Sequence, residues 1–292
     1  MEIKPIHLNK DNDNLSFSKK DYSSLSPVTR YIFIISEIMK EYNKDKSKRL
    51  FFRGQACEKW AVEPGVFRKN FLSVEHELIC SSISRNPNEF VNMSDFALLA
   101  KLQHYGLPTR LLDITQNPLV ALYFACEQEK DCDGAVYVAL ASSFLPETDK
   151  TKMLSCFATI DLNHMKSSEI VKILAKKNVF IKTYYNKTSN NYKQICEKAI
   201  SYFVLPDMNH ERIIRQSGAF LLCGSINIEE ENNTVKITKS SEDQHSKFDY
   251  KIIICYKEKD RILNELDLLN INEAALFPEL ENQLTYVKNR HG

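Results

Sequence analysis

Apolar residues recur with helical spacing in several stretches of the first half of the chain. The expected helices are one that opens at Ser26–Pro27 and ends at the polar run Asn43–Arg49, then Glu75–Ser84, Asp95–Tyr105 and Asn117–Lys130. A serine or asparagine oxygen can cap a first turn, proline fits that turn because it needs no free N–H, and glycine suits the position just past a helix end. The chain has such residues at Ser94, Asn117, Pro118 and Gly106.

Shorter apolar or alternating runs predict β-strands. The expected strands are Leu50–Phe52, Gly134–Leu140, Tyr202–Leu205, Ala219–Cys223, Val235–Thr238 and Tyr250–Tyr256. Two more helices are expected at Asp260–Leu269 and Pro278–Lys288. Because helices and strands interleave without a regular β-α-β alternation, the pattern favours an α+β fold with a mixed sheet over a doubly wound parallel sheet.

The length of 292 residues suits one large domain or two small ones. We predict a leader with weak order at residues 1–24 and a single domain over residues 25–292. This domain would have a helical N-terminal cover, a mixed-sheet core and a helical C-terminus. Residues 145–200 are rich in Lys and Asn and poor in motifs, so they are expected to form a variable helical insertion.

The charges nearly balance, with 39 Lys and Arg against 38 Asp and Glu and a formal net charge of +1. Such a chain has no overall basic field that would hold long duplex nucleic acid or an anionic membrane, although a small basic pocket is compatible with it. The polar N-terminal residues do not resemble a secretory signal, and no run approaches the ~18 apolar residues of a membrane span. We therefore expect a cytoplasmic protein without a membrane partner.

The eight cysteines are scattered and form no CxxC pair, so they are expected to be free thiols in a reducing cytoplasm. The sequence has no HExxH motif and no helix-spaced histidine pair, and His104 and Asp113 are nine residues apart. No metal site is therefore expected. A Walker loop and a GxGxxG motif are also absent, which disfavours ATP-driven chemistry.

Polar residues gather around the scarce glycines at three places. The first is Phe51–Gln55, where Arg53 follows an apolar strand and precedes Gly54. A guanidinium at such a position needs a carboxylate or a phosphate, because an unpaired buried charge is costly. Arg53 is therefore either half of a structural ion pair or an anion-binding residue.

The second cluster, Gln103–Pro118, contains His, Tyr, Thr, Arg, Asp and Asn side chains between apolar residues. A merely structural loop seldom carries so many polar types, and function tends to lie on loops held by a rigid scaffold. His104 is either the last-turn histidine of a helix or a general acid–base. Asp113 has apolar neighbours, so it is expected to be buried in a structural pair with Arg53 or, since Arg110 is close by in the sequence, with Arg110.

The third cluster, His210–Phe220, predicts a short helix that stops before Gly218 and leads into a strand. Glu211 and Arg215 are four residues apart, which is the spacing of an ordinary surface pair on a helix. Glu211 also opens the helix after a turn, where the positive end of the helix dipole favours a carboxylate. We expect Glu211 to face a cleft in which all three clusters meet.

The motifs FFRGQ with Trp60, HYGLPTRLLDITQNPLVALYFAC, DGAVYVA, NHERIIRQSGAF and INEAALFPEL resemble the FRG domain of bacteria and phages, which is named after its Phe/Tyr-Arg-Gly motif. The resemblance runs from Leu50 to Pro278 and leaves out the insertion at 145–200. It implies an accessory or defence protein of mobile bacterial DNA, such as a toxin-like effector, with an antitoxin or regulatory partner.

The order of parts is also similar to that of arginine-type ADP-ribosyltransferases. Those enzymes begin with an aromatic-Arg-Gly strand end, continue through a Ser/Thr strand into a helix rich in Ala and Phe, and carry a catalytic Glu late in the chain. The corresponding parts here are Phe52–Gly54, Leu112–Thr115, Pro118–Cys126 and Glu211. The letters differ, because LDIT stands in place of Ser-Thr-Ser and the paired Glu/Gln-x-Glu is absent. The layout implies NAD as the cofactor, used for ADP-ribosyl transfer or for NAD hydrolysis.

This layout gives each polar residue a role. Arg53 would clamp the pyrophosphate of NAD, and Tyr105 or Tyr123 would stack on nicotinamide. Glu211 or Asp113 would bind the ribose and stabilise its oxocarbenium-like transition state. The candidate catalytic residues are Arg53, His104, Asp113 and Glu211, and the candidate cofactor-binding residues are Arg53, Gln55, Tyr105, Thr109, Arg110, Thr115, Tyr123 and Gln216.

The alternative is a non-enzymatic or RNA-directed module. Arginines can bind the phosphates of a nucleotide or of an RNA end, and aromatic rings can stack on its bases. In a metal-independent RNA-processing enzyme, His104 would be the general acid–base. NAD separates the two hypotheses, because only the first predicts release of nicotinamide.

Overall fold

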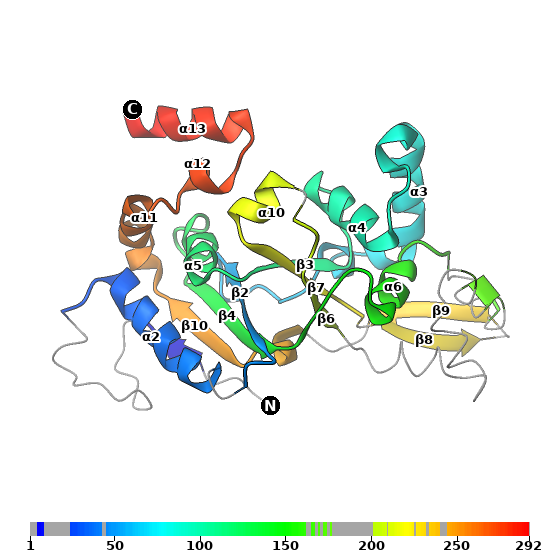
Figure 1. Cartoon of the computed structure of the whole chain (residues 1–292), viewed down its shortest axis with the longest axis horizontal. Helices are drawn as coiled ribbons and strands as arrows, with labels where there is room; N and C mark the ends of the chain where they lie inside the picture. The colour runs from blue at the N-terminus through cyan, green and yellow to red at the C-terminus, as the bar shows by residue number, and fades with distance from the viewer. Residues whose placement is uncertain are drawn as a thin grey trace.

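The computed structural model of the chain describes most of the domain. It covers residues 5–8, 24–42, 45–161, 201–208, 210–224, 226–231, 234–239 and 244–291, together with isolated positions between 165 and 176. Helices pack against a mixed eight-stranded sheet (Figure 1), which confirms the predicted α+β class. Much of the predicted insertion at 145–200 lies outside the described residues.

The eight-stranded sheet is assembled from strands far apart in the sequence. Its strands, in spatial order, are β1 (Pro5–His7), β10 (Tyr250–Ile254), β4 (Gly134–Ala141), β2 (Arg49–Gln55), β3 (Leu111–Thr115), β7 (Gly218–Leu222), β6 (Tyr202–Val204) and β5 (Ser143–Phe144). Neighbours are antiparallel, except that β1 is parallel to β10 and β5 to β6. A separate antiparallel pair is formed by β8 (Ile226–Glu231) and β9 (Thr234–Lys239).

Two groups of helices cover one face of the sheet. The first comprises α2 (Pro27–Tyr42), α5 (Pro118–Cys126), α11 (Lys259–Leu268) and α12 (Glu273–Leu276), which share a core with β2, β4 and β10. The second comprises α3 (Glu75–Arg85), α4 (Asp95–His104) and α6 (Asp149–Cys156), which share a core with β3, β6 and β7. Side chains alternate along a strand, so Phe52 lies under α5 while Phe51 enters a third core on the opposite face.

The remaining helices are short or terminal. They are α10 (Glu211–Arg215), α13 (Leu280–His291) and the 3-10 helices Gly65–Phe67, Phe71–Val74, Pro87–Phe90, Gln244–Lys247 and Tyr256–Glu258. In Figure 1, α10 lies between α5 and α4, above strands β3 and β7.

The sheet is weakly joined at its middle. β2 pairs with β4 over residues 49–55, and β3 pairs with β7 over residues 111–115. Between β2 and β3, the register in the described part of the chain consists of the single pair Phe52–Thr115. Arg53–Gln55 therefore diverge from β3, and the polar groups that face this opening must be satisfied by side chains or by a ligand.

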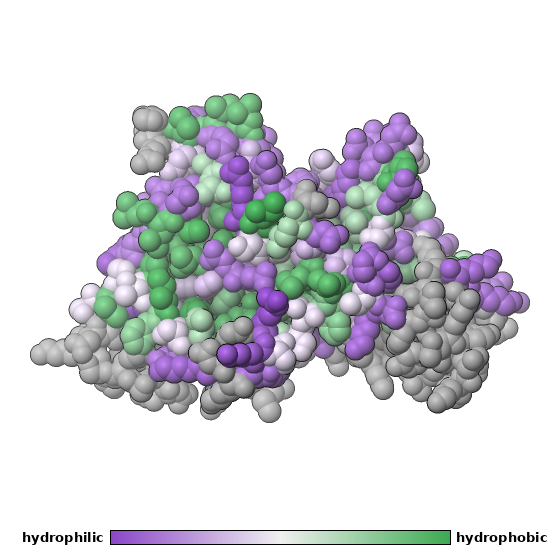
Figure 2. All heavy atoms as spheres, in the orientation of Figure 1, coloured by the Kyte–Doolittle hydropathy of each residue, from purple (hydrophilic) through white to green (hydrophobic). Residues whose placement is uncertain are grey.

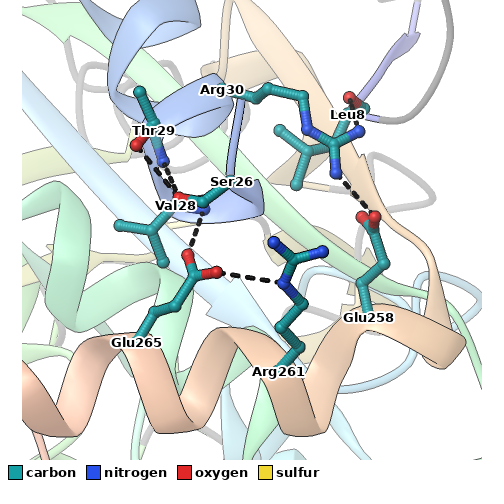
Figure 3. Close-up of polar contacts among 8 residues, drawn as sticks. All are labelled: Leu8, Ser26, Val28, Thr29, Arg30, Glu258, Arg261 and Glu265. Atoms are coloured by element: carbon teal, nitrogen blue, oxygen red, sulfur yellow. Dashed lines mark hydrogen bonds and ion pairs between the residues drawn. The ribbon is translucent and has the colours of Figure 1, made fainter. Parts of the chain in front are cut away.

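The predicted leader, residues 1–24, contributes to the fold, because it supplies strand β1 beside β10. Arg30 of α2 fastens this strand in place. Its guanidinium donates to the Leu8 carbonyl at 3.4 Å and to a Glu258 carboxylate oxygen at 2.6 Å. Figure 3 shows how these contacts and those of Glu265 tie the start of α2 to α11.

The expectation that every cysteine is a free thiol is wrong for Cys57 and Cys132, which form a disulfide with their Cα atoms 5.3 Å apart. Antiparallel pairing of β2 with β4 brings the segment after β2 beside the segment before β4. The Glu58 N–H donates to the Asp133 carbonyl at 2.7 Å in the same place. Among the described residues, the cysteines outside this disulfide are Cys80, Cys126, Cys156, Cys223 and Cys255.

Candidate functional site

A cavity of about 640 Å³ lies where β2 and β3 diverge, and its lining also includes residues of α4, α5, α10 and β7. This volume is within the range of roughly 300–1,000 Å³ that is usual for small-molecule sites. Figure 2 shows that the surface is notched between the part carrying α12 and α13 and the part carrying α3 and α4. The charged lining residues are Arg53, Arg68, Lys101, Arg212, Asp113, Glu127 and Asp207.

Arg53 spans the opening between the two strands. Its Nη1 donates to the Asp113 carbonyl oxygen at 2.7 Å, and its Nε donates to Gln55 Oε1 at 3.1 Å. Gln55 is buried and donates from its own Nε2 to the Trp60 carbonyl at 3.1 Å, so its amide is fixed in orientation. Two uncharged oxygen acceptors thus fix the position of the Arg53 guanidinium. Its positive charge can therefore interact with an anion bound in the cavity.

Electrostatics around Arg53 favour an anion. Burial lowers the pKa of the Arg53 guanidinium, the carboxylate of Asp113 opposes that shift, and the positive charge of Arg68 adds to it. A guanidinium remains charged despite such shifts, because its ordinary pKa is above ~12. Arg53 and Arg68 both line the cavity, so an anionic group between them would relieve their mutual repulsion.

The expectation that Asp113 is buried in a structural pair is wrong. Its side chain is exposed and lines the cavity. Its Oδ1 accepts a hydrogen bond from Gln103 Nε2 at 2.8 Å. The Thr109 hydroxyl donates to Gln103 Oε1 and thereby fixes which end of that amide faces the carboxylate. Thr109 lies outside the lining and therefore positions Gln103 instead of contacting a ligand.

Arg110 is a structural residue, contrary to the expectation that it binds a cofactor. It is 1% exposed, and its Nε donates to Glu75 Oε1 at 2.9 Å while Nη2 donates to the other carboxylate oxygen. This bidentate ion pair joins α3 to the start of β3. Arg110 is therefore committed to a buried carboxylate and does not line the cavity.

We expect Glu75→Gln to destabilise the domain by about 3 kcal/mol, because it leaves the buried guanidinium of Arg110 without a counter-charge. Chemical denaturation of the two proteins measures this difference. The double variant Glu75→Leu/Arg110→Met should recover part of the loss, since it removes both charges. A single variant as stable as the wild type would show that the pair contributes nothing.

Two histidines form another wall. The rings of His104, at the end of α4, and His210, just before α10, have centroids 4.1 Å apart. Tyr105 makes an edge contact with His104 and is 73% exposed, so its ring is accessible for stacking. Burial lowers the pKa of His104, and His210 and Arg212 add to that effect. These effects favour the neutral imidazole of His104, which is the form that can accept a proton.

Thr115 and Gln216 also line the cavity, but their polar groups are largely used in holding the strands. The Thr115 hydroxyl donates to the Gln216 carbonyl at 2.6 Å and accepts from the Asn117 N–H at 3.0 Å. The Gln216 amide donates to the Leu276 carbonyl at 3.2 Å. These bonds fix the turn from β3 into α5 and attach α12 to the cavity wall.

Two expected site residues lie outside the lining. Glu211 does not face the cavity, since its side chain is 71% exposed and pairs with Arg215 at 3.5 Å. Tyr123 is a buried residue of α5 and makes an edge contact with Phe124, so it cannot stack on a ligand. Phe124 is the aromatic residue of that helix that reaches the cavity.

Sequence reasoning missed Arg68, Arg212 and Glu127 as lining residues. Glu127 follows the last residue of α5, directly after the motif that ends in ALYFAC, and is four residues after Tyr123. A carboxylate placed directly after such an apolar helix was the signal that could have found it. Arg212 lies over the ring of Phe277, 4.8 Å from its centroid, and that contact joins segments far apart in the sequence.

Within the described residues, no group of three or more His, Cys, Asp or Glu side chains is arranged to hold a metal ion. In the same residues, no helix has the length and apolar character needed to cross a membrane.

The site thus belongs to an α+β domain whose sheet divides around a cavity lined by both basic and acidic side chains, with an arginine at the opening. Residues 48–134 match the family model of the FRG domain, so the chain contains an FRG domain, as the sequence motifs predicted. No curated protein and no solved structure matches the chain. The match includes Arg53, His104, Asp113 and Glu127, whereas His210 and Arg212 lie outside it.

Proposed function

We propose that the cavity binds NAD and cleaves the bond between nicotinamide and ribose. ADP-ribose would pass to water or to a protein or RNA target, and the protein would act as a toxin-like effector in bacterial defence. The observation that carries this proposal is Arg53, whose charge is offered to the cavity beside Arg68. Two arginines in the lining of a cavity of this size suit a pyrophosphate, because a guanidinium group can bind two phosphate oxygens at once.

The rest of the lining fits the same ligand. Tyr105 and Phe124 present aromatic rings on which nicotinamide or adenine can stack. As nicotinamide leaves, positive charge develops on the ribose, and a carboxylate held at that point stabilises the transition state. Asp113, oriented by Gln103, supplies such a carboxylate beside Arg53.

Arg53→Lys tests the anion-binding role. Lysine keeps the positive charge but has no planar guanidinium group, so it cannot donate to Gln55, to the Asp113 carbonyl and to a phosphate at the same time. We therefore expect nicotinamide release to fall by about 100-fold. The free energy of unfolding should change by no more than about 1–2 kcal/mol. Chromatography of nicotinamide, with a denaturant titration of each protein, gives both values.

Arg49→Lys is the matched control, because Arg49 lies on the same strand, is exposed, and is outside the lining. It should retain the wild-type rate. An Arg53→Lys protein that cleaves NAD at the wild-type rate would remove the arginine from the site. A variant that cannot fold would instead indicate that Arg53 is needed to close the gap between β2 and β3.

A second function is favoured by the contact between His104 and His210. Two histidines in one cavity can act as general base and general acid in metal-independent cleavage of RNA, and His104 is suited to be the base. This function predicts cleavage of single-stranded RNA in the presence of a chelator, loss of that cleavage in His104→Ala, and no release of nicotinamide from NAD.

A further inference from the structure

Glu127 is the acidic residue of the cavity that the sequence motifs did not indicate. It directly follows α5, and its backbone N–H donates to the Tyr123 carbonyl at 2.9 Å, which continues the helix by one residue. Its side chain is half-buried and lines the cavity together with Phe124 of the same helix. A carboxylate in this position is attached to a rigid helix that is packed in the core.

The groups around this carboxylate come from three elements. From its own segment, Tyr123 hydrogen-bonds it and Lys130 lies nearby, while Arg212 faces it from α10 and Glu273 from α12. Burial raises the pKa of Glu127 to about 7, and the charge of Glu273 acts in the same direction. The hydrogen bond from Tyr123 and the charges of Arg212 and Lys130 oppose this rise. Both the protonated and the ionised form are therefore available near neutral pH.

We propose that Glu127 is the catalytic proton acceptor of this cavity, a proposal that rests on the NAD cleavage proposed above. A water molecule beside the carboxylate attacks C1′ of the ribose. The C1′–O bond forms as the C1′–N bond to nicotinamide breaks, and the bonding electron pair leaves with nicotinamide. The proton of the water passes to the Glu127 carboxylate and then to solvent, so the products are ADP-ribose, nicotinamide and one proton.

The other groups of the cavity are less suited to this step. The carboxylate of Asp113 is already bonded by Gln103 and lies beside Arg53, so it is placed to face the developing positive charge. Tyr123 keeps its proton, because burial raises its pKa, and it is therefore a donor to Glu127. His104 belongs to the wall formed by α4 and the segment before α10, in contact with His210.

The test compares wild type, Glu127→Gln and Glu129→Gln from pH 5 to pH 9. The control residue Glu129 is exposed, lies two positions further on and is outside the lining. For the wild type we expect nicotinamide release to fall about tenfold per pH unit below pH 7, since protonation removes the acceptor. Glu127→Gln should lose about 100-fold or more at pH 8 and should bind ADP-ribose as tightly as the wild type in calorimetry. Glu129→Gln should match the wild type throughout.

Stability gives a readout that does not depend on activity. The unfolded chain ionises Glu127 near its ordinary pKa of 4.5, whereas the folded chain keeps the proton up to about pH 7. The wild type therefore loses stability as the pH rises through this interval, and the loss persists above it. Glu127→Gln should melt at a higher temperature than the wild type at pH 8, with a smaller difference at pH 5.

Tyr123→Phe gives a second measurement in case Glu127→Gln folds poorly. Removing the hydroxyl that bonds the carboxylate should raise the pKa of Glu127, so the acid limb of the rate profile should move to higher pH. An unmoved limb would contradict the proposal, as would a Glu127→Gln protein that is active or that no longer binds ADP-ribose. In those outcomes NAD cleavage by the wild type still stands. A wild type that releases no nicotinamide overturns both the cleavage and the role of Glu127.

Discussion

Gly54→Ala is expected to yield little folded protein, with a loss of more than about 4 kcal/mol of stability. A Cβ atom at this position would lie 1.9 Å from the Ala121 carbonyl oxygen and 2.8 Å from the Ala125 nitrogen. Both are backbone atoms of α5, which is embedded in the core and cannot move away without losing its own packing. The glycine of the Phe-Arg-Gly motif is therefore required because a helix packs directly on its backbone.

Gly218→Ala is the matched control, since Gly218 is also a strand glycine of the cavity lining. Its added Cβ would meet Ile213 at 3.4 Å, which is ordinary van der Waals contact. Soluble yield and chemical denaturation of the two variants provide the comparison, with Gly218→Ala changing stability by no more than about 1 kcal/mol. A Gly54→Ala protein as stable as Gly218→Ala would mean that α5 can shift away from the sheet.

Local patterns predicted the helices well, because their ends are fixed by chemistry close in sequence. The helix expected at Asp95–Tyr105 is α4, Asp95–His104. Ser94 caps it by accepting from the Ala97 N–H at 3.2 Å, and Gly106 follows it with a φ of 89°. Those roles need only neighbouring residues, so a single sequence contains the information.

Strand order and pairing could not be predicted in the same way. Strand β1 is three residues long and becomes regular only through its parallel pairing with β10, near the other end of the chain. The disulfide between Cys57 and Cys132 likewise depends on β2 lying next to β4, across a separation of 75 residues. Before the sheet order is known, those cysteines look no different from the others.

Only part of the candidate site could be predicted, because the rest also depends on contacts between residues far apart in the sequence. Arg53 and Asp113 lie in dense motifs, and the structure brings them together in one cavity. The pKa of Glu127 depends on burial and on the charges of Glu273 and Arg212, which are distant in sequence. Arg110 stands in a dense motif too, but its partner Glu75 belongs to a helix that carries no motif. Motif density alone therefore does not separate ligand-binding residues from those that hold the scaffold.

Asp113→Asn is expected to keep the fold and to lose about 1,000-fold in nicotinamide release, the largest activity effect that we predict. The side chain is exposed in a strand whose other residues are buried, so the substitution removes no packing. Asparagine has a carbonyl oxygen that can still accept from Gln103 Nε2, which preserves the local geometry. What is lost is the negative charge that faces the ribose as nicotinamide departs.

Glu211→Gln provides the contrast, because the sequence favoured Glu211 as the carboxylate that faces the ligand, whereas the structure places Asp113 in the cavity lining and Glu211 outside it. Its exposed pair with Arg215 contributes at most about 0.5 kcal/mol, so neither stability nor activity should change measurably. A thermal melt and a nicotinamide-release assay on both variants decide the matter. An inactive Glu211→Gln beside an active Asp113→Asn would require α10 to turn its first residue into the cavity when ligand binds, and would move the cation-stabilising carboxylate from β3 to that helix.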